Sequence, residues 1–152
     1  MPTFHQLLKN VAIDYATAIT GSTGNSNYPV IDMRGYEAIA FAAFPNGTPS
    51  TAGSSIKIQQ GSSSGMSTGD AADLTGTSVS LSSSITDGYV ATDIYRPGDR
   101  YVRLVHVKTS TADIFNNVVV LQYRPGYAPI THGSTAKQHG VEYHVSPAEG
   151  TA

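Results

Sequence analysis

The stretch Arg100-Tyr-Val-Arg-Leu-Val-His-Val-Lys108 decides the fold class, because apolar residues alternate along it and the turn dipeptide Pro97-Gly98 leads directly into it. A period of two is typical of a β-strand with one buried face. The continuous apolar run Asn117-Val-Val-Val-Leu-Gln-Tyr123 predicts a central strand that is buried on both faces. Further strands are predicted at Val11–Thr20, Tyr28–Asp32, Glu37–Phe44, Ser55–Gln60, Thr77–Leu81 and Tyr89–Tyr95.

Seven or eight short strands, spaced about 8–12 residues apart, are typical of a sandwich or a barrel. We predict an all-β fold, a β-sandwich of jelly-roll type, with an ordinary Greek-key sandwich as the alternative. Gly21–Asn27 is expected to be a loop, and Asn46-Gly47 is the strongest turn signal. The glycine- and serine-rich segment Gly61–Gly69, with Met66 in its middle, is expected to be a mobile connector unless a partner orders it.

The sequence divides into three parts. Residues 1–10 are expected to form an N-terminal arm, residues 11–126 the sandwich domain and residues 127–152 a C-terminal arm. Phe4–Val11 has room for one or two helical turns, and isolated helices that short are marginal. A purely flexible tail would rarely carry the alternating triplet Val141, Tyr143 and Val145, so we expect the C-terminal arm to add a strand to its own sheet or to a neighbouring subunit.

The composition favours protein–protein contacts over charge-driven binding. Charged residues make up 13% of the 152 residues, whereas 17 are Ser and 16 are Thr, so the surface is rich in hydroxyls and little charge must be desolvated on docking. The net charge of −2 gives no general attraction to nucleic acid or anionic membrane. The absence of cysteine excludes disulfides and thiolate metal sites. With no signal-peptide layout and no bilayer-length apolar run, we expect a soluble protein made in the cytosol.

The residues that catalysis or metal binding would need occur without the required spacing. The five histidines match no zinc motif, and the closest set, His139, Glu142 and His144, lies in the C-terminal arm. His106 is expected to be a strand residue that faces solvent or makes a hydrogen bond. Gly61-Ser-Ser-Ser-Gly65 has the letters of a nucleophile elbow, but no helix follows it. We therefore predict that the chain is not an enzyme and has no catalytic residue, cofactor or metal ion.

Three segments stand out as a set. Tyr28–Phe44 contains an Asp-x-Arg-Gly-Tyr step, and Ile56–Gln60 leads through a variable loop to Ala72–Thr77. Ile94–Val105 carries Arg-Pro-x-x-Arg-Tyr-Val-Arg and is followed by Val118–Gly126. In this order, over roughly residues 28 to 130, the segments resemble small structural proteins of tailed bacteriophages, in particular the capsid decoration (cement) proteins.

The resemblance implies a β-sandwich that binds the outer capsid shell at junctions between major capsid subunits, as dimers or trimers reinforced by terminal arms, with no active-site residues. We expect a virion structural protein on the capsid surface, assembled in the host cytoplasm. Its expected partners are the major capsid protein and itself, as a homotrimer or homodimer, with no nucleic acid or membrane partner. The alternatives are a phage neck or tail protein and a carbohydrate-binding module that uses Tyr36, Tyr89, Tyr95 and Tyr101.

The expected contact residues lie in the two arms and in the glycine-rich loop. They are Phe4, Leu7, Met66, Tyr127, Ile130, Val141, Tyr143 and Val145. Arg100 and Arg103 are expected to be structural, because they flank Tyr101 in a strand that follows a tight turn and lies near Asp93 and Asp99 in the sequence.

Overall fold

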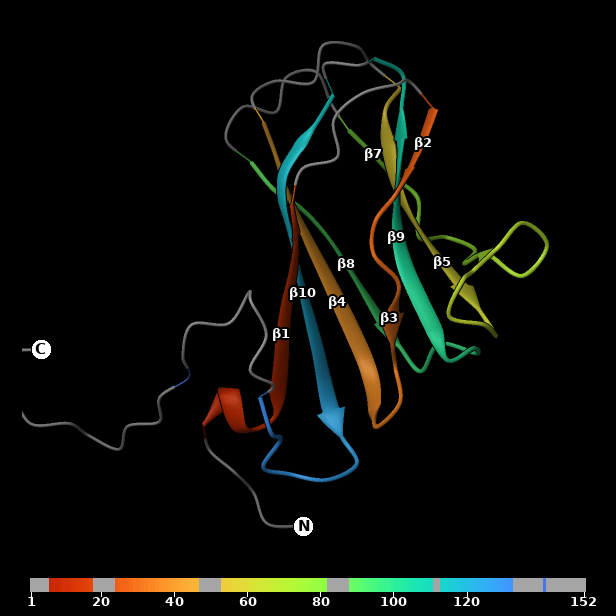
Figure 1. Cartoon of the computed structure of the whole chain (residues 1–152). Coiled ribbons are helices and arrows are strands. Elements are labelled where there is room, and N and C mark those ends of the chain that lie inside the picture. Colours follow the sequence, from red (N-terminus) through yellow and green to blue (C-terminus); the bar gives the residue numbers. More distant parts are fainter. Residues whose placement is uncertain are drawn as a thin grey trace, which may run out of the picture.

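Two antiparallel sheets pack face to face in the computed structural model of the chain, which describes residues 6–17, 24–46, 53–81, 88–110, 113–132 and 141 (Figure 1). The four-stranded sheet has the order β1 (Val11–Thr17), β10 (Phe115–Pro125), β4 (Tyr36–Pro45) and β8 (Val90–Tyr95). The six-stranded sheet has the order β2 (Gly24–Asn27), β9 (Tyr101–Lys108), β5 (Ser55–Gly61) and β6 (Ala72–Asp73), with β3 (Ile31–Asp32) paired to β9 and β7 (Val79–Ser80) to β5. The prediction of an all-β β-sandwich is confirmed.

The alternation of side chains along each strand builds the core between the sheets. In the four-stranded sheet, Phe41 of β4 lies opposite Val120 of β10, and both are buried. In the six-stranded sheet, Ile58 of β5 lies opposite Leu104 of β9, and neither is exposed. Successive strand residues point to opposite faces, so the same period places every second residue of these strands in the core. The jelly-roll subtype and the two terminal arms stay predictions.

Two strand predictions were wrong in instructive ways. Gly24–Asn27, expected to be a loop, forms β2 and pairs with β9, because the β9 backbone offers it a hydrogen-bonding partner regardless of its side chains. The run in β10 does occupy a central position, between β1 and β4. It is not buried on both faces, however: Val118 and Val120 are buried, whereas Val119 and Leu121 are partly exposed.

The glycine- and serine-rich loop is held within the chain itself, which corrects the expectation of a mobile connector. The Asp70 carboxylate accepts hydrogen bonds from the backbone N–H and the hydroxyl of both Ser62 and Ser63, at 2.7–3.1 Å. These bonds keep the pKa of Asp70 far below its ordinary value. Met66, with a left-handed φ of 40°, is only 2% exposed and lies close to Gly61, so its side chain is not free for the contact predicted from the sequence.

Candidate interaction surface

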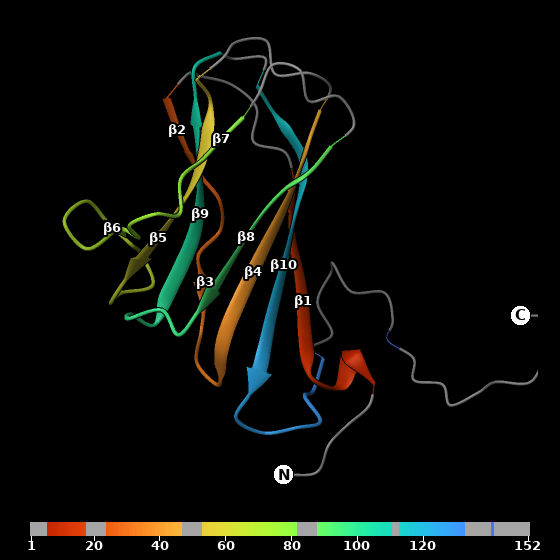
Figure 2. The ribbon, with the colours of Figure 1, turned by 180° about the vertical axis from the view of Figure 1, so that it is seen from behind.

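The N-terminal segment and the start of the C-terminal segment lie together at one end of the sandwich, which we call the base (Figures 1 and 2). A short 3-10 helix, η1 (Leu7–Lys9), precedes β1. The N–H of Ile130 donates to the carbonyl of Lys9 at 3.0 Å, and His132 Nε2 contacts the carbonyl of Leu8. Three of the predicted contact residues, Leu7, Tyr127 and Ile130, are thereby brought to the same end of the molecule.

A groove of about 710 Å³ lies at the base, between the start of β1 and the segment that follows β10. Val11, Tyr123 and Tyr127 contribute apolar surface to its lining, and Glu37 and Arg124 contribute charge. Leu7 is 69% exposed and Tyr127 is 92% exposed, so large apolar side chains stand free at this end. An apolar groove with a few charged groups is typical of a binding surface.

Two arginines share one carboxylate beside this groove. Arg96 at the end of β8 and Arg124 near the end of β10 pair with the two oxygens of Glu37, at 3.3 and 3.1 Å. Their hydrogen bonds, that of Arg124 first, hold the pKa of Glu37 below its ordinary value. Both arginines have positive φ values, 53° and 55°, and both guanidinium groups lie about 5 Å from the ring centre of Tyr95. Backbone strain of this kind is concentrated at functional sites.

The two most specific motifs of the sequence meet at the base. Arg100 forms a two-pronged ion pair with Asp32, with its Nε and one terminal nitrogen 2.8 and 2.6 Å from the two carboxylate oxygens. This hydrogen bonding lowers the pKa of Asp32 to about 2. The partner of Arg100 is not one of the acids near it in the sequence, Asp93 and Asp99, because the β3–β9 pairing brings Asp32 alongside the start of β9.

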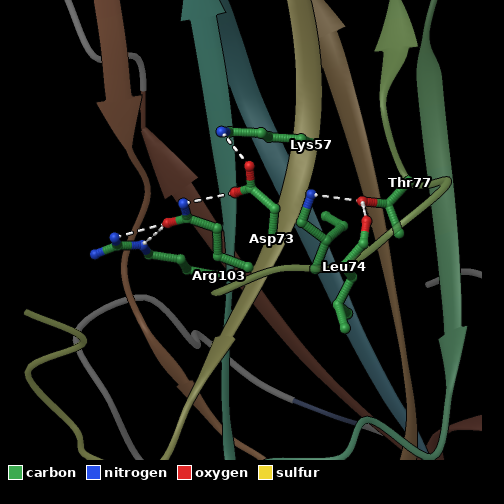
Figure 3. A network of polar contacts seen from close by, with 7 residues as sticks. Lys57, Asp73, Leu74, Thr77 and Arg103 are labelled. Carbon is green, nitrogen blue, oxygen red and sulfur yellow. Dashed lines mark hydrogen bonds and ion pairs between the residues drawn. The ribbon is translucent and has the colours of Figure 1, made fainter. Parts of the chain in front are cut away.

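The outer face of the six-stranded sheet carries a polar network that is satisfied internally (Figure 3). Arg103 donates twice to the side-chain oxygen of Gln59, whose amide nitrogen donates to Asp73 at 2.8 Å. Asp73 also pairs with Lys57 at 2.7 Å. These contacts lie within the chain and tie β9, β5 and β6 together, as a structural role for Arg103 requires.

The outer face of the four-stranded sheet is apolar across all four strands, and the sequence analysis did not identify it. In strand order its large side chains include Ile13, Tyr15, Val119, Leu121, Phe44, Tyr89 and Tyr95, with Ala38, Ala40 and Ala42 along β4. Among the described strand positions of this face, Asp93 is the only charged one, and it accepts a hydrogen bond from Tyr123 at 2.6 Å. That bond raises the pKa of Tyr123 to about 12. At the basal end of the face, the Arg96 and Arg124 guanidinium groups lie over the ring of Tyr95. We call this surface the apolar face.

A cluster of polar side chains is buried toward the opposite end of the sandwich from the base. His106 is a strand residue, as predicted, but it faces the core and not solvent: it is 1% exposed, and its ring packs at a tilt against Phe115 with ring centres 4.4 Å apart. Its Nε2 has no hydrogen-bond partner among the described residues. Nearby, the Ser54 hydroxyl bonds both Thr109 and the Asp113 carboxylate. Burial, assisted by the charge of Lys108, lowers the pKa of His106 to about 4.

Of the remaining predicted contact residues, Val141 is half-buried, and Phe4, Tyr143 and Val145 lie outside the described residues. Within the described ranges, no group of three or more metal-ligating side chains is close enough to hold a metal ion. In the same ranges, no helix is long and apolar enough to cross a membrane.

Comparisons with known proteins leave the family open. No family model matches the chain, and neither a curated protein nor a solved structure shows significant similarity to it. The fold and the two surfaces define a β-sandwich with an exposed apolar face and an apolar groove at its base.

Proposed function

We propose that the chain is a virion structural protein that decorates a bacteriophage capsid and stabilises it by binding the major capsid protein at subunit junctions. One observation carries the proposal: η1 and the segment after β10 are tied together around the basal groove, with Leu7 and Tyr127 exposed beside it. The motifs that resemble decoration proteins lie at the same end, at the Asp32–Arg100 ion pair and around Arg96. A sandwich attached through its base adds its binding energy to the assembled shell.

Symmetry makes weak contacts sufficient for this role. A capsid offers many identical junctions, and a protein that engages several of them gains avidity without any new type of contact. Tyrosine and arginine are among the residue types that contribute most to binding at protein interfaces. At the base these are Tyr127 and Tyr123, with Arg96 and Arg124 beside them, and Leu7 adds an exposed apolar side chain.

A carbohydrate-binding module would need aromatic rings with free faces. The ring of Tyr95 is covered by two guanidinium groups, from Arg96 at 5.0 Å and Arg124 at 5.3 Å. The ring of Tyr101 is contacted by Arg100 at 5.0 Å. Of the tyrosines considered for sugar stacking, Tyr95 and Tyr101 are thus contacted by arginine, whereas Tyr89 is 68% exposed. A neck or tail role differs from decoration only in the partner.

The test is co-sedimentation with capsids assembled from the major capsid protein encoded in the same genome. The wild-type chain should pellet with the capsids, and the double variant Leu7→Ser, Tyr127→Ser should lose at least tenfold in apparent affinity while keeping its circular dichroism spectrum. Thr75→Ala, an exposed position near the edge of the six-stranded sheet, is the matched control and should bind as wild type. A genome without a capsid gene, or undiminished binding of the double variant, would contradict the proposal.

A further inference from the structure

The apolar face has the relief of a surface that fits a copy of itself. Along β4, Ala40 and Ala42 form a low row of small side chains, continued by Ala91 of β8. The neighbouring strand β10 carries the bulkier Val119 and Leu121 opposite them. The alanine row is therefore a shallow trough bordered by the higher ridge of β10.

The outer faces of the two sheets differ in their polar side chains and in what these side chains bond. On the outer face of the six-stranded sheet, the polar side chains form hydrogen bonds and an ion pair with one another. They are Arg103, Gln59, Asp73 and Lys57. On the apolar face, Tyr123 already bonds Asp93, and the Arg96 and Arg124 guanidinium groups that lie over Tyr95 at its basal end are already paired with Glu37. Covering this face would desolvate almost no unpaired charge, so its burial is favourable.

The size of the apolar face matches what a stable protein pair buries. Four strands spaced about 4.8 Å apart are roughly 19 Å wide, and strands of six to eleven residues run for about 20–37 Å. The flat area is thus roughly 400–700 Å², and the accessible area of projecting side chains is larger. Each partner in a stable complex buries about 600–1,000 Å². The face alone can supply such an interface.

We propose that the apolar face binds the same face of a second copy of this chain, sheet against sheet, about a two-fold axis. An axis beside the alanine row seats a bulky ridge of each copy in the trough of the other, so one symmetric arrangement satisfies both contacts. Away from Tyr95 the face offers no unpaired charge to a charged partner, whereas its own relief supplies the complementary shape. The basal groove adjoins this face and shares Tyr123 with it, whereas Leu7 and Tyr127 lie at the end of the sandwich, so variants of these two residues test capsid binding without altering the face.

The test is sedimentation equilibrium of the full chain from about 1 to about 100 µM. The wild type should sediment with the mass of two 15.9 kDa copies. Ala91→Arg, at an exposed position of β8, and Ala40→Arg, in the trough, should each shift the protein to monomer, with unchanged circular dichroism in Ala91→Arg. Thr75→Arg places the same charge outside the face and should leave the dimer intact.

Three outcomes would overturn the pairing. They are a wild type that is monomeric throughout, an oligomer larger than two copies, and a dimer that persists in both arginine variants. A two-fold contact between identical faces closes at two copies, which is why a trimer counts against it. Capsid binding is measured separately, with variants of the base, so either proposal can fail while the other stands.

Discussion

The buried His106 side chain should make the sandwich lose stability as the pH falls toward 4. It is 1% exposed and packs against Phe115. Burial first, and then the positive charge of Lys108, lower its pKa from 6.5 to about 4, while the charge of Asp113 opposes this shift. The folded protein therefore keeps the imidazole neutral at pH values where the unfolded chain has protonated it.

The sign and size follow from proton linkage. Above pH 6.5 the imidazole is neutral in both states, so it adds no pH dependence. Between pH 6.5 and 4 only the unfolded state gains the proton, so unfolding becomes progressively easier, and below about pH 4 the loss levels off. At about 1.36 kcal/mol per unit of pKa difference, the full loss is about 3 kcal/mol.

The assay is urea unfolding followed by far-UV circular dichroism at several pH values from about 7 to about 5.5, a window above the ordinary titration of carboxylates. His106→Leu, close in size and without a titrating group, should flatten the profile in this window. His132→Gln, at a partly exposed histidine of the base, is the matched control and should keep the wild-type slope. The reasoning is refuted if His106→Leu loses as much stability as the wild type between these pH values.

Three further changes test other parts of the structure. Asp70→Ala removes the acceptor that holds the loop at residues 62–70, so limited proteolysis there should speed up several-fold with little change in the urea midpoint; an unchanged cleavage rate would contradict the clamp. Lys108→Met should raise the unfolding free energy by about 1–2 kcal/mol, because Lys108 is 3% exposed and its Nζ has no hydrogen-bond partner in the described chain; a lower midpoint would count against this. Asp32→Asn should lower the urea midpoint at neutral pH, and the difference from wild type should vanish as the pH falls through about 2, since the lowered pKa contributes stability above the ordinary value of 3.8. Asp99→Asn should change the midpoint little, and the opposite ranking of the two would mean that Arg100 has the other partner.

Most of the strands could be predicted from the sequence, because their signal is local. The alternation in Ser55–Gln60 and the turn before Arg100 give β5 and β9 nearly at their observed bounds. β2 was missed because Gly24–Asn27 has no apolar alternation and is a strand only through its backbone pairing with β9. The ordered conformation of the loop at residues 62–70 was not predicted either, because the hydrogen bonds to Asp70 come from residues seven and eight positions away.

The candidate surfaces were predictable only in part. Leu7 and Tyr127 are apolar residues outside any strand pattern, and this marks them as surface contacts, but their shared position depends on the hydrogen bond between Lys9 and Ile130, 121 residues apart. The apolar face was hidden because a strand such as β4 is apolar on both faces, and such a strand reads as buried on both sides. Which of the two faces is buried depends on which one the second sheet covers, and the local sequence pattern does not show this.

The bond between Lys9 and Ile130 also makes the described sandwich nearly a closed ring, in which the chain enters and leaves at neighbouring points. A circularly permuted chain, in which these two ends are joined and the backbone is opened at another loop, would therefore keep every strand pairing. The exposed turn at Thr75-Gly76, next to the short β6, is the natural place to open it. Such a rearranged chain would begin and end beside the six-stranded sheet, away from both the base and the apolar face, and cargo fused there would leave both binding surfaces clear.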